Sequence, residues 1–310
     1  MTKLLTVFGS TGQQGGSLID YVLKHPELLR LYHLRGITRD VSKANAVALK
    51  ERGVEIVQAD LNDPASLVAA VSGSYAVFGV TNFWEQASQD IEIAQGKAIA
   101  DASVAAGVSL LIWSSLPNIT KISEGKLTAV KHFDGKAEVE EYIRTLPILS
   151  VFYMPGAYMQ NYIAYMRPQP KGDGTYVLSQ PTSPTAQVPM IDITDTGKYI
   201  APILFDPAKY TGKRFTCATA FHTPLQLVEG WTKVTGKQVS YSSIDDDASA
   251  GAITPEMRAE LKKSTGLMDD YSYYGPTGKK DLEWTHAQVK DKLTTWEEFV
   301  QANEPWFEGA

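Results

Sequence analysis

Short apolar stretches alternate with longer amphipathic ones through the first half of the chain. The apolar stretches have the length of strands and lie at Leu4–Phe8, Tyr32–Thr38, Val54–Ala59, Ala76–Thr81, Val108–Ser114 and Ile148–Tyr153. Helical patterns between them run to about Lys24, from Ser42 to before Gly53, from Asp63 to Gly73, from Ser88 to Gly107 and over Phe133–Arg144. This alternation predicts β-α-β units and a parallel sheet. A mixed α+β fold would require several of the helix ends to be accidental.

The second half of the chain loses this rhythm. Residues 167–189 are rich in Pro, Gly, Ser and Thr and predict a long connection with one short strand at Tyr176–Leu178. Residues 192–197 predict a strand end followed by a helix start, and Phe215–Ala218 predicts another strand. Helices are expected from about Pro224, and the acidic run at 245–247 is interpreted as a solvated turn. The aromatic residues near the end of the chain are interpreted as core packing rather than a binding surface: Trp296, Phe299, Trp306 and Phe307.

The expected fold is therefore α/β: a Rossmann-type doubly wound parallel sheet with a smaller, mostly helical C-terminal lobe. A length of 310 residues suits one large domain that carries such a lobe. Residues 1–155 would form the Rossmann domain, to which 185–222 return. Residues 156–184 and 223–310 would form the lobe, over the carboxyl edge of the sheet where open α/β folds bind ligands.

Composition narrows the classes of function. The chain has 29 basic and 35 acidic residues, a net charge of −6, so it lacks the positive field of a general nucleic-acid or anionic-membrane binder. Its single cysteine, Cys217, excludes an internal disulfide and a cysteine-rich zinc site, and the five histidines lack ligand spacing, so we predict no metal. Neither a signal peptide nor a membrane span is evident. We expect a soluble protein of the cytoplasm, with the nucleus as a second compartment.

A glycine loop joins the first predicted strand to the first helix. Its three glycines, Gly9, Gly12 and Gly15, follow the spacing G-x-x-G-x-x-G, which is typical of extended and atypical short-chain dehydrogenase/reductases. Gly9 permits a tight turn, Gly12 lets a pyrophosphate approach the backbone, and Gly15 lets the helix pack close to the strand. The amides at the helix start would then face the phosphates. The alternative is a structural turn without a ligand.

The end of the second predicted strand indicates which dinucleotide is bound. An NAD site uses a carboxylate there for the ribose 2′-hydroxyl, but this chain has Arg39, with Lys43 one helical turn later. A guanidinium can hold a 2′-phosphate through paired, charge-assisted hydrogen bonds. We therefore predict NADP(H), the alternative being that Arg39 pairs with a surface carboxylate. Asp60, at the end of the third strand, either reaches the adenine or caps the next turn.

Several segments together resemble the NmrA-like family, an atypical branch of the short-chain dehydrogenase/reductases, and within it the redox-sensor proteins most of all. They are the Gly9–Gly16 loop, Thr38-Arg39, Gln58-Ala-Asp60, Thr81-Asn-Phe-Trp84, Gln95-Gly-Lys97 and the run from His132 to Tyr142. The resemblance extends through residues 4–165 and 188–197 and is thinner after about Thr235.

The resemblance implies an NADP(H) site whose residues can be assigned position by position. The loop residues Gly9, Thr11, Gly12, Gln13, Gln14 and Gly15 would hold the pyrophosphate. Arg39 and Lys43 would hold the 2′-phosphate, Asp60 and Leu61 the adenine, and Thr81, Asn82 and Phe83 the middle of the cofactor. Lys97 and Lys136 would face the ribose and nicotinamide, and Tyr158 and Asn161 would lie near the nicotinamide.

The residues expected to catalyse a reaction match the pattern of short-chain reductases only in part. Short-chain reductases use Tyr-x-x-x-Lys, in which the lysine lowers the tyrosine pKa and the phenol passes a proton to the substrate. Lys136 is present, but four residues earlier stands His132, while Tyr142 falls on another face. Three interpretations stay open: a binding site without turnover, a proton donated by His132, or catalysis by Lys136 alone as the resembling isoflavone-reductase-like enzymes suggest. Ser114 or Ser115 is the candidate for the upstream serine.

Two functions follow from the resemblance. The first is a redox-sensing regulator in which NADPH or NADP⁺ orders residues 118–131 and changes the surface offered to a protein partner or to a second copy of the chain. That segment could equally be an ordinary polar loop. The second is an NADPH-dependent reductase of a carbonyl, imine or quinone, whose small substrate would bind among aromatic side chains: Phe83, Trp84, Tyr153, Tyr158 and Tyr162. Direct nucleic-acid or membrane binding is not expected.

Overall fold

The computed structural model describes residues 2–243 and 266–307, and the acidic run at 245–247 lies outside them. Its main feature is a seven-stranded sheet in the order β11-β6-β5-β4-β1-β2-β3, with every neighbouring pair parallel. The strands are β1 (Lys3–Val7), β2 (Tyr32–Thr38), β3 (Glu55–Gln58), β4 (Ala76–Gly79), β5 (Leu110–Ser114), β6 (Leu149–Pro155) and β11 (Arg214–Cys217). This confirms the predicted α/β fold and its doubly wound sheet.

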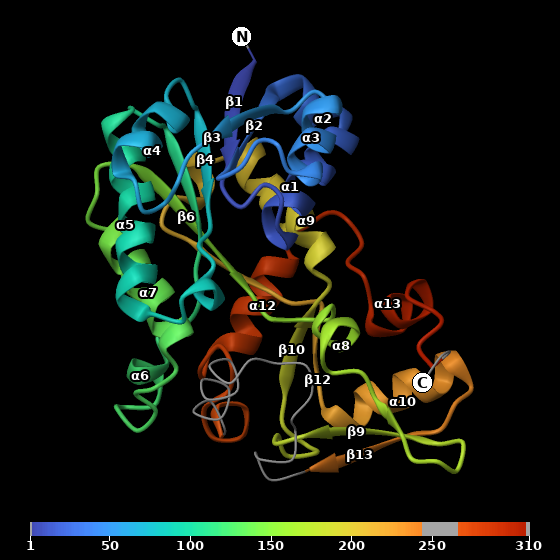
Figure 1. Cartoon of the computed structure of the whole chain (residues 1–310). Helices are drawn as coiled ribbons and strands as arrows, with labels where there is room; N and C mark the ends of the chain where they lie inside the picture. The colour runs from blue at the N-terminus through green and yellow to red at the C-terminus, as the bar shows by residue number, and fades with distance from the viewer. Residues whose placement is uncertain (1, 244–265, 308–310) are drawn as a thin grey trace.

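Helices cover both faces of this sheet (Figure 1). One face packs against α1 (Gln13–Lys24), α3 (Ala44–Glu51) and α9 (Thr196–Phe205), whose apolar residues share a core with β1, β4 and β6. The other face packs against α4 (Pro64–Val71), α5 (Gln89–Ala105) and α7 (Lys131–Ile143). Because both faces are covered, the central strand β5 is apolar from Leu110 to Trp113, and all five of its residues are buried.

The strand order reverses between β1 and β4. Strands β2 and β3 follow outward from β1, whereas β5 and β6 follow outward from β4 in the opposite direction. At such a switch point the connections after the two central strands leave in opposite directions and open a crevice at their carboxyl ends. The glycine loop follows β1 and residues 80–85 follow β4, so both border that crevice.

Several elements were not predicted from the sequence, among them one helix and one strand of the described residues. Helix α2 (Pro26–Leu31) directly follows α1, and the His25 side chain caps it by accepting a hydrogen bond from the Leu28 amide at 3.4 Å. Strand β13 (Val239–Ser243) stands where only helices were expected. Its sequence has just one residue with a strong preference for burial, Val239, and β13 becomes a strand by parallel pairing with β9.

Within the described residues, the smaller lobe contains two three-stranded sheets, the short helix α8 (Asn161–Ala164) and two longer helices. The sheets are β12-β10-β7 and β13-β9-β8, made of β7 (Ala157–Tyr158), β8 (Gln169–Pro170), β9 (Tyr176–Gln180), β10 (Val188–Ile191) and β12 (Ala220–His222). Helices α10 (Pro224–Thr235) and α13 (Trp296–Ala302) pack against each other in the half of the molecule away from the N-terminus (Figure 1). Helix α12 (Gly278–His286) lies against β11 at the edge of the large sheet.

The aromatic residues of the tail are confirmed as core. Trp296, Phe299 and Trp306 are at most 2% exposed and surround Trp231, which lies 4.8 Å from the Trp296 ring. Phe307 stacks on Tyr176 at 3.9 Å between ring centroids. Rings at these separations add favourable edge-to-face and stacked contacts to the burial of apolar area, so this cluster holds the lobe together.

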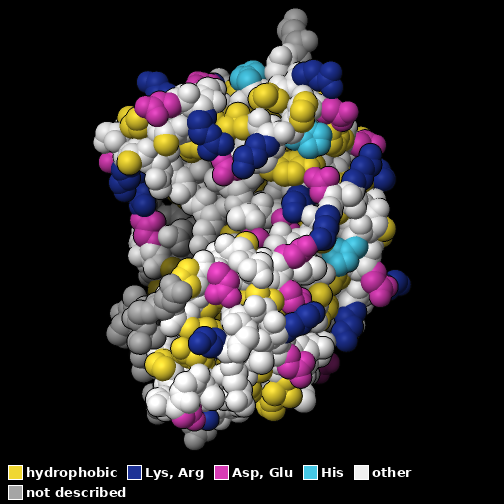
Figure 2. Space-filling model, turned by 90° about the vertical axis from the view of Figure 1, so that its right-hand side faces the viewer, with side chains coloured by type: hydrophobic (Ala, Val, Ile, Leu, Met, Phe, Trp, Pro, Cys, Tyr) yellow, Lys and Arg dark blue, Asp and Glu magenta, His cyan; other side chains and the backbone are white. Residues whose placement is uncertain are grey.

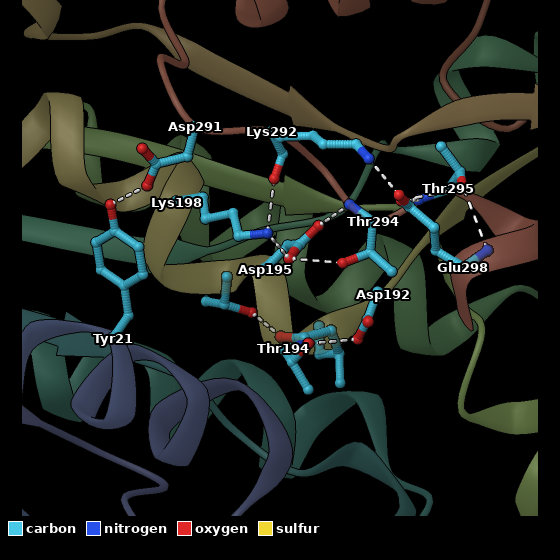
Figure 3. Close-up of polar contacts among 12 residues, drawn as sticks. Tyr21, Asp192, Thr194, Asp195, Lys198, Asp291, Lys292, Thr294, Thr295 and Glu298 are labelled. Carbon is cyan, nitrogen blue, oxygen red and sulfur yellow. Dashed lines mark hydrogen bonds and ion pairs between the residues drawn. The ribbon is translucent and has the colours of Figure 1, made fainter. Parts of the chain in front are cut away.

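A polar junction ties the segment before α13 to the Rossmann domain (Figure 3). The buried carboxylate of Asp195 accepts hydrogen bonds from the Thr294 amide at 2.7 Å and its hydroxyl at 3.1 Å, and it pairs with Lys198 at 2.6 Å. The Lys198 ammonium also donates to the Lys292 carbonyl. A helix start was expected within residues 192–197, and Asp195 does stand at the N-cap of α9, but its side chain bonds the segment before α13 and not the amides of the first turn.

Charges of both signs are mixed on the face shown in Figure 2, where basic and acidic side chains lie close together without a continuous basic area. None of the helices in residues 2–243 and 266–307 is long and apolar enough to cross a membrane. Within the same residues, no three His, Cys, Asp or Glu side chains gather where they could hold a metal ion.

Candidate functional site

A cleft with a volume of about 1520 Å³ occupies the crevice at the switch point and continues into the lobe. That volume exceeds the roughly 300–1,000 Å³ of an ordinary ligand pocket, as a dinucleotide would require. It brings together nearly all of the residues that the sequence assigned to a cofactor or to catalysis: Gly9, Thr11, Gly12, Gln13, Gln14, Gly15, Arg39, Lys43, Asp60, Leu61, Thr81, Asn82, Phe83, His132, Lys136, Tyr158 and Asn161.

Lys97 is the exception. It lies two residues after Gln95, which does line the cleft, and two residues turn a helix by roughly 200°. Its ammonium instead lies 4.9 Å from the centroid of the Tyr142 ring, between α5 and α7. Lys97 therefore stands outside the cleft, and the expectation that it faces the ribose is not met in this structure.

The glycine loop has the backbone geometry that its spacing predicts. Gly9 has φ = 61°, the left-handed region that glycine occupies without strain, and its carbonyl accepts a hydrogen bond from the Gly12 amide at 2.9 Å. Gly12 is the N-cap of α1 and has no side chain to bond the amides of the first turn. Those amides and the positive end of the helix dipole border the cleft, which is the arrangement that attracts a phosphate.

Gly15 is the glycine that the packing requires most. A Cβ atom at this position would lie 2.4 Å from the Gly9 carbonyl oxygen and 2.7 Å from that of Phe8, closer than real contacts allow. Gly15→Ala should therefore push α1 away from β1, lower the free energy of unfolding by about 1–3 kcal/mol and weaken dinucleotide binding about tenfold. Urea denaturation and fluorescence titration would measure the two effects.

Gly16→Ala is the matched control for this change, because a Cβ at Gly16 meets only the Ser10 carbonyl at 3.4 Å, an ordinary contact. Alanine also favours the helix over glycine by about 1 kcal/mol, so Gly16→Ala should leave stability unchanged or higher. If the two variants behaved alike, close packing of α1 on β1 would not explain the third glycine.

The residues that the sequence assigned to the adenosine part of the cofactor line the cleft together: Arg39 and Lys43 after β2, and Asp60 after β3. In the structure Arg39 forms an ion pair with Glu85, which also lines the cleft, so the alternative of a surface pair is what the side chain adopts here. Asp60 Oδ1 accepts hydrogen bonds from the Asn62 amide at 2.9 Å and side chain at 3.1 Å, as the turn-capping alternative predicted. Both residues nevertheless line the same cleft.

Three polar side chains form a chain across the middle of the cleft. Ser114 at the end of β5 donates to Gln14 Oε1 at 2.7 Å, and Gln14 Nε2 donates to the Tyr158 hydroxyl at 2.5 Å. Burial raises the pKa of Tyr158 to about 12, an effect that the bond from Gln14 only partly offsets. The phenol is therefore neutral at physiological pH. Of the two candidate serines, Ser114 lies in the cleft, while Ser115 donates to the buried Glu140 at 2.6 Å.

Lys136 is held by a buried acidic partner that was not predicted from the sequence. Its ammonium lies 2.6 Å from Glu92 Oε1, 2.9 Å from Thr81 Oγ1 and 3.1 Å from the Thr81 carbonyl. Thr81 in turn donates to Glu92 at 2.7 Å. The Lys136 side chain is 10% exposed and that of Glu92 1%. An ammonium has three protons, and these three acceptors can take all of them.

His132 lies among aromatic rings at the start of α7. Its imidazole is 5.0 Å from Trp84, 5.7 Å from Phe83 and 4.7 Å from Phe133, measured between ring centroids. Of the aromatic residues expected to line a substrate pocket, Tyr153 does not: it is buried in the large core and hydrogen-bonds Thr196 at 3.1 Å. The other four border the cleft.

The segment at 118–131 is anchored at its first end. It starts with the short helix α6 (Ile119–Ile122), whose first two amides donate to the buried Asp134 at 2.6 and 3.2 Å. Asp134 belongs to α7, the helix that also carries His132 and Lys136 into the cleft. This segment is therefore connected to the cleft through one helix rather than standing apart as an isolated surface loop.

The residues that sequence reasoning missed are the acidic partners, Glu92 and Glu85. The sequence around Glu92 could have indicated its role, because Glu92 shares one face of the helix with Gly96 and Ile99, which are buried. A carboxylate on a buried face needs a partner of opposite charge. No sequence pattern indicated the role of Glu85, because it lies in a short exposed turn and its partner, Arg39, is 46 residues away in the sequence.

Comparisons with known proteins agree with this arrangement. A model of the NmrA-like family matches residues 1–300. An NmrA-like family domain-containing protein of Dictyostelium discoideum is 31% identical over 309 residues, covering 97% of this chain and 98% of its own. An NmrA-like family domain-containing oxidoreductase of Aspergillus campestris is 30% identical over 308 residues, covering 92% of this chain and 89% of its own.

Among solved structures, NmrA has a similar fold; it is described as a negative transcriptional regulator in complex with NADP. It matches with a TM-score of 0.81 and 23% identity, over 98% of this chain and 95% of that one. At this identity the match concerns the fold, and it covers the lobe as well as the Rossmann domain.

Proposed function

Since the chain belongs to the NmrA-like family, we propose that it binds NADP(H) in this cleft and acts as a redox-sensing regulator whose loaded form is recognised by a protein partner. The cleft supports the first part of the proposal. It combines a glycine loop at a helix start, two basic residues after β2 and room for an extended ligand. The NADP in the complex of NmrA, a protein of the same fold, also supports it.

The ion pair and hydrogen bonds of Lys136 favour a cofactor-binding protein over an enzyme. In Tyr-x-x-x-Lys reductases the lysine serves cofactor and phenol, and it lowers the pKa of that phenol. Here the ammonium is occupied by Glu92 and Thr81, and the cleft phenol, Tyr158, has its pKa raised to about 12. Proton relay through this pair is therefore disfavoured, whereas binding a cofactor requires no proton transfer.

The regulatory part of the proposal uses the connection along α7. A cofactor that contacts His132 at the start of this helix would shift the population of conformations at residues 118–131, which Asp134 ties to the same helix. That segment would present the surface that a partner or a second copy of the chain reads. Hydrogen exchange at 118–131 should slow when NADPH is added and return when it is removed.

An NADPH-dependent reductase of a carbonyl, imine or quinone is the second candidate, and one observation favours it. Besides the residues assigned to the nucleotide, the cleft lining includes aromatic and apolar side chains: Trp84, Tyr162, Tyr165, Met166 and Leu178. A flat substrate would pack there, with Tyr158 or His132 as proton donor. The relative from Aspergillus campestris that is named an oxidoreductase also supports this candidate.

Parallel titrations test both candidates. We expect NADPH and NADP⁺ to bind in the micromolar range or tighter, NADH to bind at least about tenfold more weakly, and the absorbance of NADPH to stay constant with quinones, imines and aldehydes. A marked difference between NADPH and NADP⁺ would support sensing. Turnover that is lost in His132→Ala, with the affinity for NADPH kept, would replace the regulator by the reductase. If no dinucleotide binds, both candidates fail.

A further inference from the structure

We propose that Glu85 sets the discrimination between NADP(H) and NAD(H), by competing with the 2′-phosphate for the Arg39 guanidinium. This role rests on the proposed binding of NADP(H) in the cleft. Glu85 would be a specificity-determining residue that acts against the phosphorylated cofactor and limits how tightly it binds.

The position of the ion pair places it in the path of the ligand. Arg39 follows β2, while Glu85 ends the 3₁₀ turn η1 (Phe83–Glu85) after β4, and β1 with its glycine loop lies between these two strands in the sheet. The Arg39–Glu85 pair therefore bridges the cleft beside the glycine loop, and both residues line the cleft. A 2′-phosphate that binds Arg39 must take the place of the Glu85 carboxylate.

Glu85 is also the carboxylate in this region that is not committed elsewhere. The cleft lining near Arg39 and Lys43 includes Asp40, Asp60 and Glu85, three acidic groups against two basic ones. Asp40 accepts hydrogen bonds from the Ser42 amide at 2.9 Å and its hydroxyl, which lower the pKa of Asp40 and hold it in its own turn. Asp60 is held in the same way by Asn62. Glu85 contacts the guanidinium itself.

The consequence differs for the two dinucleotides. A phosphate monoester carries about −1.5 to −2 charges at neutral pH, so NADP(H) must break the ion pair and then lie close to the carboxylate that it displaced. NAD(H) carries a neutral 2′-hydroxyl, which leaves the pair intact and can donate a hydrogen bond to Glu85. The pair therefore costs affinity for NADP(H) and none for NAD(H). Because Arg39 is 57% and Glu85 41% exposed, water and salt weaken this effect.

Glu85→Gln removes the charge while keeping the size of the side chain. We expect this variant to bind NADP⁺ about fivefold more tightly than the unmodified protein at low salt, equivalent to about 1 kcal/mol. Binding of NAD⁺ should change by less than about twofold, and the gain for NADP⁺ should disappear near 0.5 M salt, where exposed charges are screened. Adenosine 2′,5′-bisphosphate, which lacks the nicotinamide half, should show the same gain.

Glu27→Gln is the matched control, because Glu27 is an exposed glutamate in α2 outside the cleft; it should change neither affinity. The proposal is overturned if Glu85→Gln leaves NADP⁺ binding unchanged, or if NADP⁺ and NAD⁺ gain alike, since a merely structural effect of the turn would move both. If the unmodified protein binds NADP⁺ and the variant gains nothing, only the role of Glu85 fails. If neither dinucleotide binds to any variant, the proposed function fails and the role of Glu85 with it.

Discussion

Arg39→Asp should weaken the binding of NADP⁺ by about a hundredfold or more while changing that of NAD⁺ by less than about fivefold. The variant removes a charge-assisted contact to the phosphate, which contributes about 1.5–3 kcal/mol, and places a second carboxylate beside Glu85, where the phosphate would lie. Each 1.4 kcal/mol is a factor of ten in affinity. Isothermal titration at a single, low salt concentration would measure both dissociation constants.

Arg52→Asp is the control for this change of charge. Arg52 is an arginine outside the cleft that pairs with Asp20 at 2.6 Å, so its loss removes an exposed ion pair without touching the proposed site. Arg52→Asp should therefore bind NADP⁺ almost as tightly as the unmodified protein does. If Arg39→Asp and the unmodified protein bound NADP⁺ with equal affinity, the assignment of Arg39 to the 2′-phosphate would be wrong. The predicted preference for NADP(H) over NAD(H) would then lose its structural basis.

The sequence predicts well those parts of the site that are local along the chain. The glycine loop, Arg39 after β2 and Asp60 after β3 each follow a strand, and parallel strands bring their carboxyl ends to one edge. Knowing the strands and their direction is therefore enough to bring these residues together, and all of them border one cleft. The same holds for the helix face that carries His132 and Lys136.

Partners that come from elsewhere in the fold could not be predicted in this way. Lys136 on α7 meets Glu92 on α5 only because the two helices pack side by side, and no pattern within either helix specifies the other. Lys97 shows the converse: its segment resembles the family, but its position on α5 turns it towards Tyr142. Helix α2 was missed because a six-residue helix directly after another leaves little periodicity to detect.

Lys136→Ala should lower the free energy of unfolding by about 3–5 kcal/mol, because it leaves the Glu92 carboxylate buried without its counter-ion. Glu92 is 1% exposed, and its second oxygen, Oε2, is already buried without a hydrogen bond among the described residues. Neutralising both partners should cost less. We therefore expect the double variant Lys136→Met with Glu92→Gln to recover about half of the lost stability or more, as measured by urea denaturation.

The comparison of these variants separates a structural lysine from a catalytic one. If Lys136 serves mainly to neutralise Glu92 and fix Thr81, the double variant should regain NADPH affinity together with stability, since Thr81 lines the cleft. Lys97→Ala, a lysine on α5 outside the cleft, should affect neither quantity by a comparable amount. A reductase that depends on Lys136 would behave differently, because its turnover would stay lost in the double variant even after the fold and the binding had recovered. A stable Lys136→Ala protein would contradict the buried ion pair itself, because a carboxylate at this depth cannot stay charged without a partner at little cost.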